Sequence, residues 1–179
     1  GKPTKAYIGE SACGYTASDL EKMSVEQDWM YLLTDQIERR NLSVKEKEDY
    51  DKYMISLPID KWKVKLPSGL GAGQNVSLLL SERSLPVDHI DDFSHLSRPF
   101  ICIATDVVTG NEVVLDHGYL PDAIRASMAI PTIFTPVEID GKLLVDGGLV
   151  HNFPVDRMVE MGADIIIGVN VGGKDYTKD

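Results

Sequence analysis

Long apolar runs, cysteines and positive charges are all scarce in this sequence, and each shortage excludes a class of protein. No apolar run approaches the roughly 20 residues that a membrane-spanning helix needs. The two cysteines, Cys13 and Cys102, stand at no metal-ligand spacing, and the apolar neighbours of Cys102 favour a buried thiol over a disulfide. The net charge of −10 would repel phosphate and anionic lipid head groups, so we expect no nucleic-acid partner and only local, apolar contact with lipid.

At 179 residues with 43% hydrophobic side chains, the sequence fits one domain, residues 1–179, long enough to bury a sizeable core. Residues 41–97 are expected to form an accessory excursion within it, because their first part is heavily charged and offers no broad apolar face. Trp62 lies between lysines there. It fits either an exposed edge strand or an aromatic contact with a membrane surface. The sequence starts at Gly1 without a signal peptide or an initiator Met, so we expect a processed or truncated piece.

The N-terminal part carries helix signals of unequal strength. Residues 6–15 fit either a strand and turn or a short helix. A helix after them is better supported, because Ser18–Glu21 forms a capping box, with Thr16 as the alternative cap. A further helical turn is expected at Trp29–Leu33.

Two stretches in the middle of the chain could suggest ligands. The glycines of Gly69–Leu80 could be taken for a phosphate loop, but no strand precedes them and the Lys-Ser/Thr pair is missing, so we expect a helix capped near Asn75. His89 and His95 lie among three aspartates and could suggest a metal site, yet an acidic loop of this kind is usually solvated surface. We therefore predict no metal. The aspartates in question are Asp88, Asp91 and Asp92.

The strongest strand signals lie in the second half of the chain. The near-continuous apolar run Arg98–Val108 predicts a strand in the middle of a sheet, with Glu112–Asp116 as its hairpin arm. Asp164–Val171 predicts another buried strand. A helix over residues 154–162 precedes it, and this order would make a right-handed crossover with parallel strands. An α/β layered sheet follows, with a further helix over residues 121–129 that contains Ser127, a poor place for a nucleophile.

One short stretch combines a hairpin with a carboxylate. Asp140–Gly141 predicts a type I′ turn, so Lys142–Val145 is the expected return strand. The strand delivers Asp146 into Gly147 and Gly148, where no alternating pattern follows and a proline soon appears, so a second hairpin is excluded. Two glycines allow a sharp turn and a close approach to a neighbouring loop or ligand, with the carboxylate pointing out of the sheet edge. The alternative is a turn or capping aspartate.

Together with Ala126–Pro136 before it and Asn152–Pro154 after it, this stretch closely resembles the patatin-like phospholipase family. The resemblance runs from about Gly14 to Val171 and is most specific between Phe100 and Pro154. It implies an α/β fold, a three-layer α/β/α sandwich with a mixed, mainly parallel central sheet. It also implies an acyl hydrolase for phospholipids or other lipid esters that needs no metal or cofactor. Asp146 would partner a serine in a Ser-Asp dyad, with Gly147 and Gly148 as the supporting motif.

The sequence departs from the family pattern at its start. The resemblance implies a glycine-rich oxyanion loop and a Gly-X-Ser-X-Gly elbow, and neither occurs; the nucleophile would fall near Gly1–Thr4. We therefore expect the acid/base half of a larger lipase-like protein, inactive by itself. A missing first strand would expose a sheet edge, which could favour self-association. Peripheral membrane contact is a further expectation, and similar bacterial proteins are cytoplasmic or associated with the cell envelope.

Three alternatives stay open at this stage. The chain could be an inactive relative of the family, or a non-enzymatic module that binds lipid or another partner. It could also be an esterase of another family that uses Ser11, because Gly9–Gly14 is similar to a carboxylesterase elbow, although Cys13 occupies the position of the elbow glycine.

Overall fold

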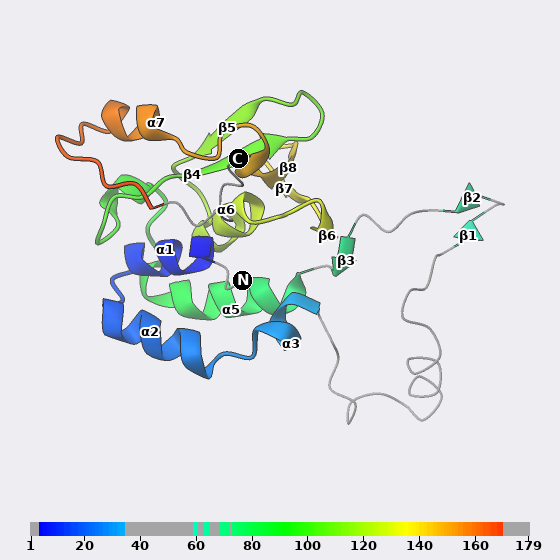
Figure 1. Cartoon of the computed structure of the whole chain (residues 1–179), viewed down its shortest axis with the longest axis horizontal. Helices are drawn as coiled ribbons and strands as arrows, with labels where there is room; N and C mark the ends of the chain where they lie inside the picture. The colour runs from blue at the N-terminus through cyan, green and yellow to red at the C-terminus, as the bar shows by residue number, and fades with distance from the viewer. Residues whose placement is uncertain (1–3, 35–58, 61–62, 65–68, 72, 170–179) are drawn as a thin grey trace, which may run out of the picture.

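The computed structural model describes residues 4–34, 59–60, 63–64, 69–71 and 73–169 (Figure 1). Trp62 and residues 41–58 of the expected accessory excursion lie outside the described residues. The division of the chain into one domain with an excursion therefore stays a prediction.

The central element is a four-stranded antiparallel sheet in the order β5-β4-β8-β7. Its strands are β4 (Cys102–Asp106), β5 (Glu112–Leu115), β7 (Val137–Ile139) and β8 (Lys142–Asp146). The expected central strand is confirmed, because β4 pairs with β5 on one side and with β8 on the other. The predicted type I′ hairpin between β7 and β8 is confirmed as well, since Asp140 and Gly141 adopt φ angles of 51° and 71°.

Six helices are described. The N-terminal stretch takes the helical alternative, and the capping box uses Thr16 and Asp19 in place of Ser18: the Thr16 hydroxyl accepts from the Asp19 N–H, and the Asp19 carboxylate accepts from the Thr16 N–H. The helices are α1 (Thr4–Ala12), α2 (Ala17–Glu26), α3 (Trp29–Thr34), α5 (Gln74–Ser84), α6 (Leu120–Ser127) and α7 (Val155–Glu160). The short strands are β1 (Ile59–Asp60), β2 (Lys63–Val64), β3 (Gly69–Gly71) and β6 (Thr132–Phe134), and the 3₁₀ turns are Leu85–Val87, Phe93–His95 and Gly147–Leu149.

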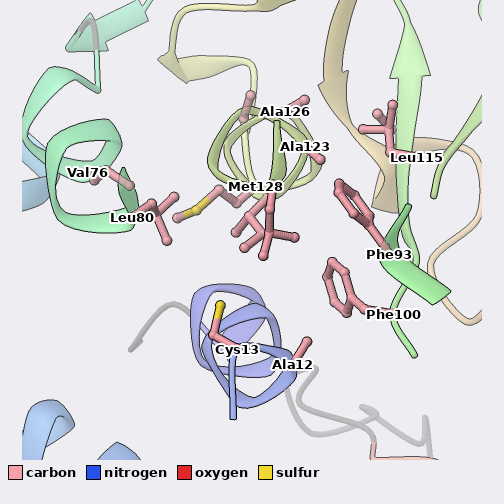
Figure 2. Close-up of a cluster of buried hydrophobic side chains, with 14 of the residues drawn as sticks. Ala12, Cys13, Val76, Leu80, Phe93, Phe100, Leu115, Ala123, Ala126 and Met128 are labelled. Carbon is pink, nitrogen blue, oxygen red and sulfur yellow. The ribbon is translucent and has the colours of Figure 1, made fainter. Parts of the chain in front are cut away.

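Helix α6 lies between the sheet and the helices α1 and α5, so the described part of the chain is layered (Figure 1). Seven of its eight residues are buried. Figure 2 looks along α6 and shows apolar side chains of α1, α5 and the sheet gathered around it. Ala123 and Ala126 bring the backbone of α6 close to its neighbours, and Phe93 and Phe100 pack against each other with ring centroids 6.2 Å apart.

The start of α5 is set by a tertiary contact. Gly73 precedes the helix with φ +73°, and a Cβ at this position would lie 2.1 Å from the Arg125 guanidinium. Arg125 is buried in α6 and lies 4.6 Å from the centre of the Phe134 ring. The helix therefore begins at Gln74, with Gly73 as its N-terminal cap, and the cap predicted near Asn75 is displaced by two residues.

Two strand predictions differ from the structure. The four-stranded sheet is antiparallel throughout, so a mainly parallel sheet is not confirmed; among the described residues, only β3 and β6 pair in parallel. The predicted buried strand Asp164–Val171 is wrong for its described part, residues 164–169, which form no strand. Ile165, Ile167 and Val169 are 83%, 86% and 72% exposed. A run of β-branched residues forms a strand only where it can pair with a neighbouring strand and pack against an apolar layer.

Candidate active site

Asp146 is the last residue of β8, and contacts from two other elements fix its backbone. Its N–H donates to the Ala129 carbonyl just after α6, at 3.0 Å. Its carbonyl accepts from the Thr105 hydroxyl of β4, also at 3.0 Å. The carboxylate oxygen Oδ1 accepts from the Gly148 N–H at 2.7 Å, so Asp146 caps the 3₁₀ turn Gly147–Leu149. The exclusion of a second hairpin is thereby confirmed.

The two glycines after Asp146 are required by space and not by unusual φ angles. A Cβ on Gly147 would lie 2.2 Å from the Ile103 carbonyl oxygen of β4. A Cβ on Gly148 would lie 2.9 Å from Asn152 Oδ1 and 3.1 Å from Asp146 Oδ1. Gly147 therefore lets the chain cross β4 closely, and Gly148 leaves room for the Asn152 amide and the Asp146 carboxylate.

We expect Gly147→Ala to destabilise the protein by about 1–3 kcal/mol, because the added methyl group meets the backbone of a central strand that cannot move aside. Thermal or urea unfolding measures this loss. Gly148→Ala is the matched comparison: its new methyl group meets the ends of two side chains, which can shift, so the loss should be smaller. Equal stability of Gly147→Ala and the unchanged chain would contradict the close approach of this turn to β4.

An apolar cavity of about 180 Å³ lies beside the glycine pair. Its walls come from α1, α6, the strand β4 with the residues before it, and α7, and its polar side chains are Ser127, His151 and Asn152. The apolar residues include Ile8, Phe100, Ile103, Ile124, Pro154 and Met158. A cavity with these walls suits the apolar part of a ligand, with polar groups near the turn that follows Asp146.

The two serines considered as nucleophiles both lie in helices. Ser127 lies in a helix, as predicted: it is the last residue of α6, and it is also buried. Ser11 lies in α1, where its hydroxyl accepts from Arg98 at 3.3 Å. A nucleophile elbow requires a sharp turn from a strand into a helix, so the conformation of Ser11 contradicts the alternative of an esterase that uses it.

The described residues give no support to a metal site or a membrane span. Within the described ranges, no group of three or more His, Cys, Asp or Glu side chains could hold a metal ion, the acidic loop of His89 and His95 included. None of the helices in the described part of the chain is long and apolar enough to cross a membrane.

Sequence reasoning missed a charged network at the end of the turn that follows Asp146, around His151. Glu112 of β5 receives His151 Nδ1 on Oε2 at 2.5 Å and Arg157 Nε on Oε1 at 2.8 Å. His151 Nε2 also lies 3.3 Å from an Asp156 carboxylate oxygen, and Arg157 pairs with Glu160 at 2.7 Å. The bond from His151, and then the bond and charge of Arg157, lower the pKa of Glu112 below its usual value.

These observations define a class of protein: an α/β protein in which an aspartate is fixed at a strand end and is followed by two glycines that line an apolar cavity. A comparison with family models gives the particular family, because the patatin-like phospholipase model matches residues 12–159. This chain belongs to the patatin-like phospholipase family, and the match includes Asp146 and both glycines.

Individual relatives match over shorter stretches. An uncharacterized NTE family protein of Mycobacterium tuberculosis is 40% identical over 80 residues, 45% of this chain and 22% of that protein. A second such protein, of Mycobacterium bovis, is 41% identical over 64 residues, 36% of this chain and 11% of that protein. Patatin-like phospholipase domain-containing protein 7 of Rattus norvegicus is 34% identical over 112 residues, 62% of this chain and 8% of that protein. The chain therefore spans less than a quarter of the length of these relatives.

Proposed function

We propose that this chain supplies the acid/base half of a lipid acyl hydrolase, with Asp146 as the general base of a Ser-Asp dyad. The observation that carries the proposal is that the Asp146 carboxylate is held by the N–H of Gly148, a residue that lines the apolar cavity. Family membership supports it, because a patatin-like phospholipase acts on lipid esters, and the cavity suits an acyl chain.

In this mechanism the Asp146 carboxylate accepts the serine proton while the serine oxygen attacks the ester carbonyl. Backbone N–H groups of a glycine-rich loop stabilise the oxyanion that forms. The 179 residues contain no Gly-X-Ser-X-Gly, so the serine and the loop belong to residues outside this sequence. The turn after Asp146 contributes by holding the carboxylate, since the Gly148 N–H donates to its Oδ1 at 2.7 Å.

The proposal is tested on the whole protein that contains this chain. Vesicles of phosphatidylcholine and droplets of a neutral lipid ester with the same acyl chains are incubated with it in the presence of EDTA. We expect release of free fatty acid. EDTA should not prevent it, because no step of the proposed mechanism uses a metal. If neither substrate releases fatty acid, the result favours the second candidate, a lipid-binding module or inactive relative. The missing elbow motif also fits this candidate.

The finer fold belongs to the same proposal. In the whole protein, we propose a three-layer α/β/α sandwich with a mainly parallel central sheet. The exposure of Ile165, Ile167 and Val169 supports this, since further layers of the fold would cover them. The same exposed segment should make the isolated chain self-associate. Light scattering over a range of concentrations measures this, and a monomer at the highest concentration would contradict it. Peripheral contact with a membrane remains part of the proposal for the whole protein.

A further inference from the structure

The charged network of Glu112, His151 and Arg157 joins three elements that are distant in the sequence. Glu112 lies at the start of β5, His151 in the loop after Asp146, and Arg157 in α7. The side chains of Glu112 and His151 are 16% and 27% exposed, so water only partly screens their contact. Both carboxylate oxygens of Glu112 are engaged, one by His151 and the other by Arg157.

The turn that holds the Asp146 carboxylate ends at His151. The Gly148 N–H donates to Asp146 Oδ1 at its start, and the Val150 and His151 N–H groups donate to the Gly147 carbonyl at 3.1 and 2.9 Å. These bonds make residues 146–151 one tight unit with the carboxylate at one end and the imidazole at the other. The hydrogen bonds of the turn thus connect the backbone of His151 to the N–H that orients the carboxylate.

The sheet closes this unit into a ring of contacts. Glu112 lies opposite Thr105 in the β4–β5 pairing, and the Thr105 hydroxyl donates to the Asp146 carbonyl at 3.0 Å. One path from Asp146 to Glu112 thus runs through β4, and the other runs through the turn and His151. The first path is a strand ladder, whereas the second depends on the contact between Glu112 and His151.

We propose that Glu112 is a positioning residue for Asp146: it acts through His151 and the turn 147–151 to keep the Gly148 N–H on the Asp146 carboxylate. The role in catalysis rests on the proposed function, but the positioning itself does not. The competing interpretation is that the network only attaches α7 to the sheet through Arg157.

Amide hydrogen exchange on the 179-residue chain tests the positioning without any activity. In Glu112→Ala we expect the Gly148 and His151 amides to exchange at least about 10-fold faster, because the local opening free energy of the turn falls. The amides of the β4–β5 ladder should keep their rates. Glu112→Gln, which retains an acceptor oxygen and the side-chain shape, should restore part of the protection. Glu138→Ala removes an exposed glutamate from β7 of the same sheet and serves as the matched control.

Two results would overturn the proposal. Unchanged Gly148 exchange with faster α7 exchange would show that the network only attaches α7. Glu112→Ala could speed exchange throughout the sheet, and the milder variants Glu112→Gln and His151→Gln then distinguish the two interpretations. Faster exchange throughout β4 in both of them would mean that the network stabilises the sheet in general.

In the whole protein, we expect Glu112→Gln to lower kcat by about 10-fold with little change in KM, because a misplaced base acts mainly in the transition state. If exchange changes as expected but the unchanged protein hydrolyses no ester, the proposed function fails and the positioning stands. If the protein is active and Glu112→Ala leaves both exchange and kcat unchanged, the positioning fails and the proposed function stands.

Discussion

The 179-residue chain, purified alone, should hydrolyse a short-chain nitrophenyl ester no faster than the uncatalysed background. The sequence offers Asp146 as a base but contains no Gly-X-Ser-X-Gly, and a base without a nucleophile and an oxyanion hole has nothing to activate. Removal of a single oxyanion donor already costs on the order of 10²–10³-fold in rate. Loss of the nucleophile together with the loop should therefore bring the rate to background.

The assay compares the chain with the whole protein under the same conditions, and a repurification step removes contaminating esterases. Turnover that survives repurification would contradict the expectation. In that case a fluorophosphonate, which labels activated serines, identifies the residue responsible. Stoichiometric labelling of Ser11 would revive the esterase alternative despite its helical position in α1.

In the whole protein, Asp146→Asn should lower turnover by roughly 10²–10⁴-fold, the usual contribution of a general base. An amide cannot take the serine proton at neutral pH. Its oxygen can still accept from the Gly148 N–H, so the turn and the melting temperature should change little. Melting temperature and specific activity are measured on the same preparation.

The matched control is Asp140→Asn, at an exposed position with φ 51° in the type I′ turn, where asparagine is equally suited. This variant should keep both its activity and its stability. The structural interpretation of Asp146 as a capping residue expects the opposite pattern, a loss of about 1 kcal/mol of stability with activity per folded molecule retained. A lowered melting temperature with near-normal turnover would remove Asp146 from the dyad.

The parts of the fold that the sequence predicted are those with local signals. The hairpin follows from the backbone preference of Asp140–Gly141, and the central strand follows from the near-continuous apolar run Arg98–Val108. Asp146 could be located because it ends such a strand. Its role as a base is a matter for the Asp146→Asn experiment, since geometry alone does not distinguish a base from a cap.

The features that the sequence did not predict depend on residues far apart in the chain. Glu112 contacts residues 39 and 45 positions away, and no spacing rule links them. The cap of α5 is Gly73 and not a residue near Asn75, and the Arg125 guanidinium of α6 leaves no room for a side chain at this cap. The strand expected at Asp164–Val171 has strong local propensity, but pairing is a property of two segments.

The placement of α6 has a consequence for variation in this chain. The helix is covered on one side by α1 and α5 and on the other by strands, so neither face can absorb a larger side chain by turning toward water. Just beyond its end, the Ala129 carbonyl holds the Asp146 N–H. Substitutions at buried positions of the outer helices, such as Ala12 or Leu80, would therefore push on α6 and shift the candidate base, although these residues lie in other elements. Sequence changes in the buried faces of α1 and α5 are therefore constrained by the need to keep Asp146 in place.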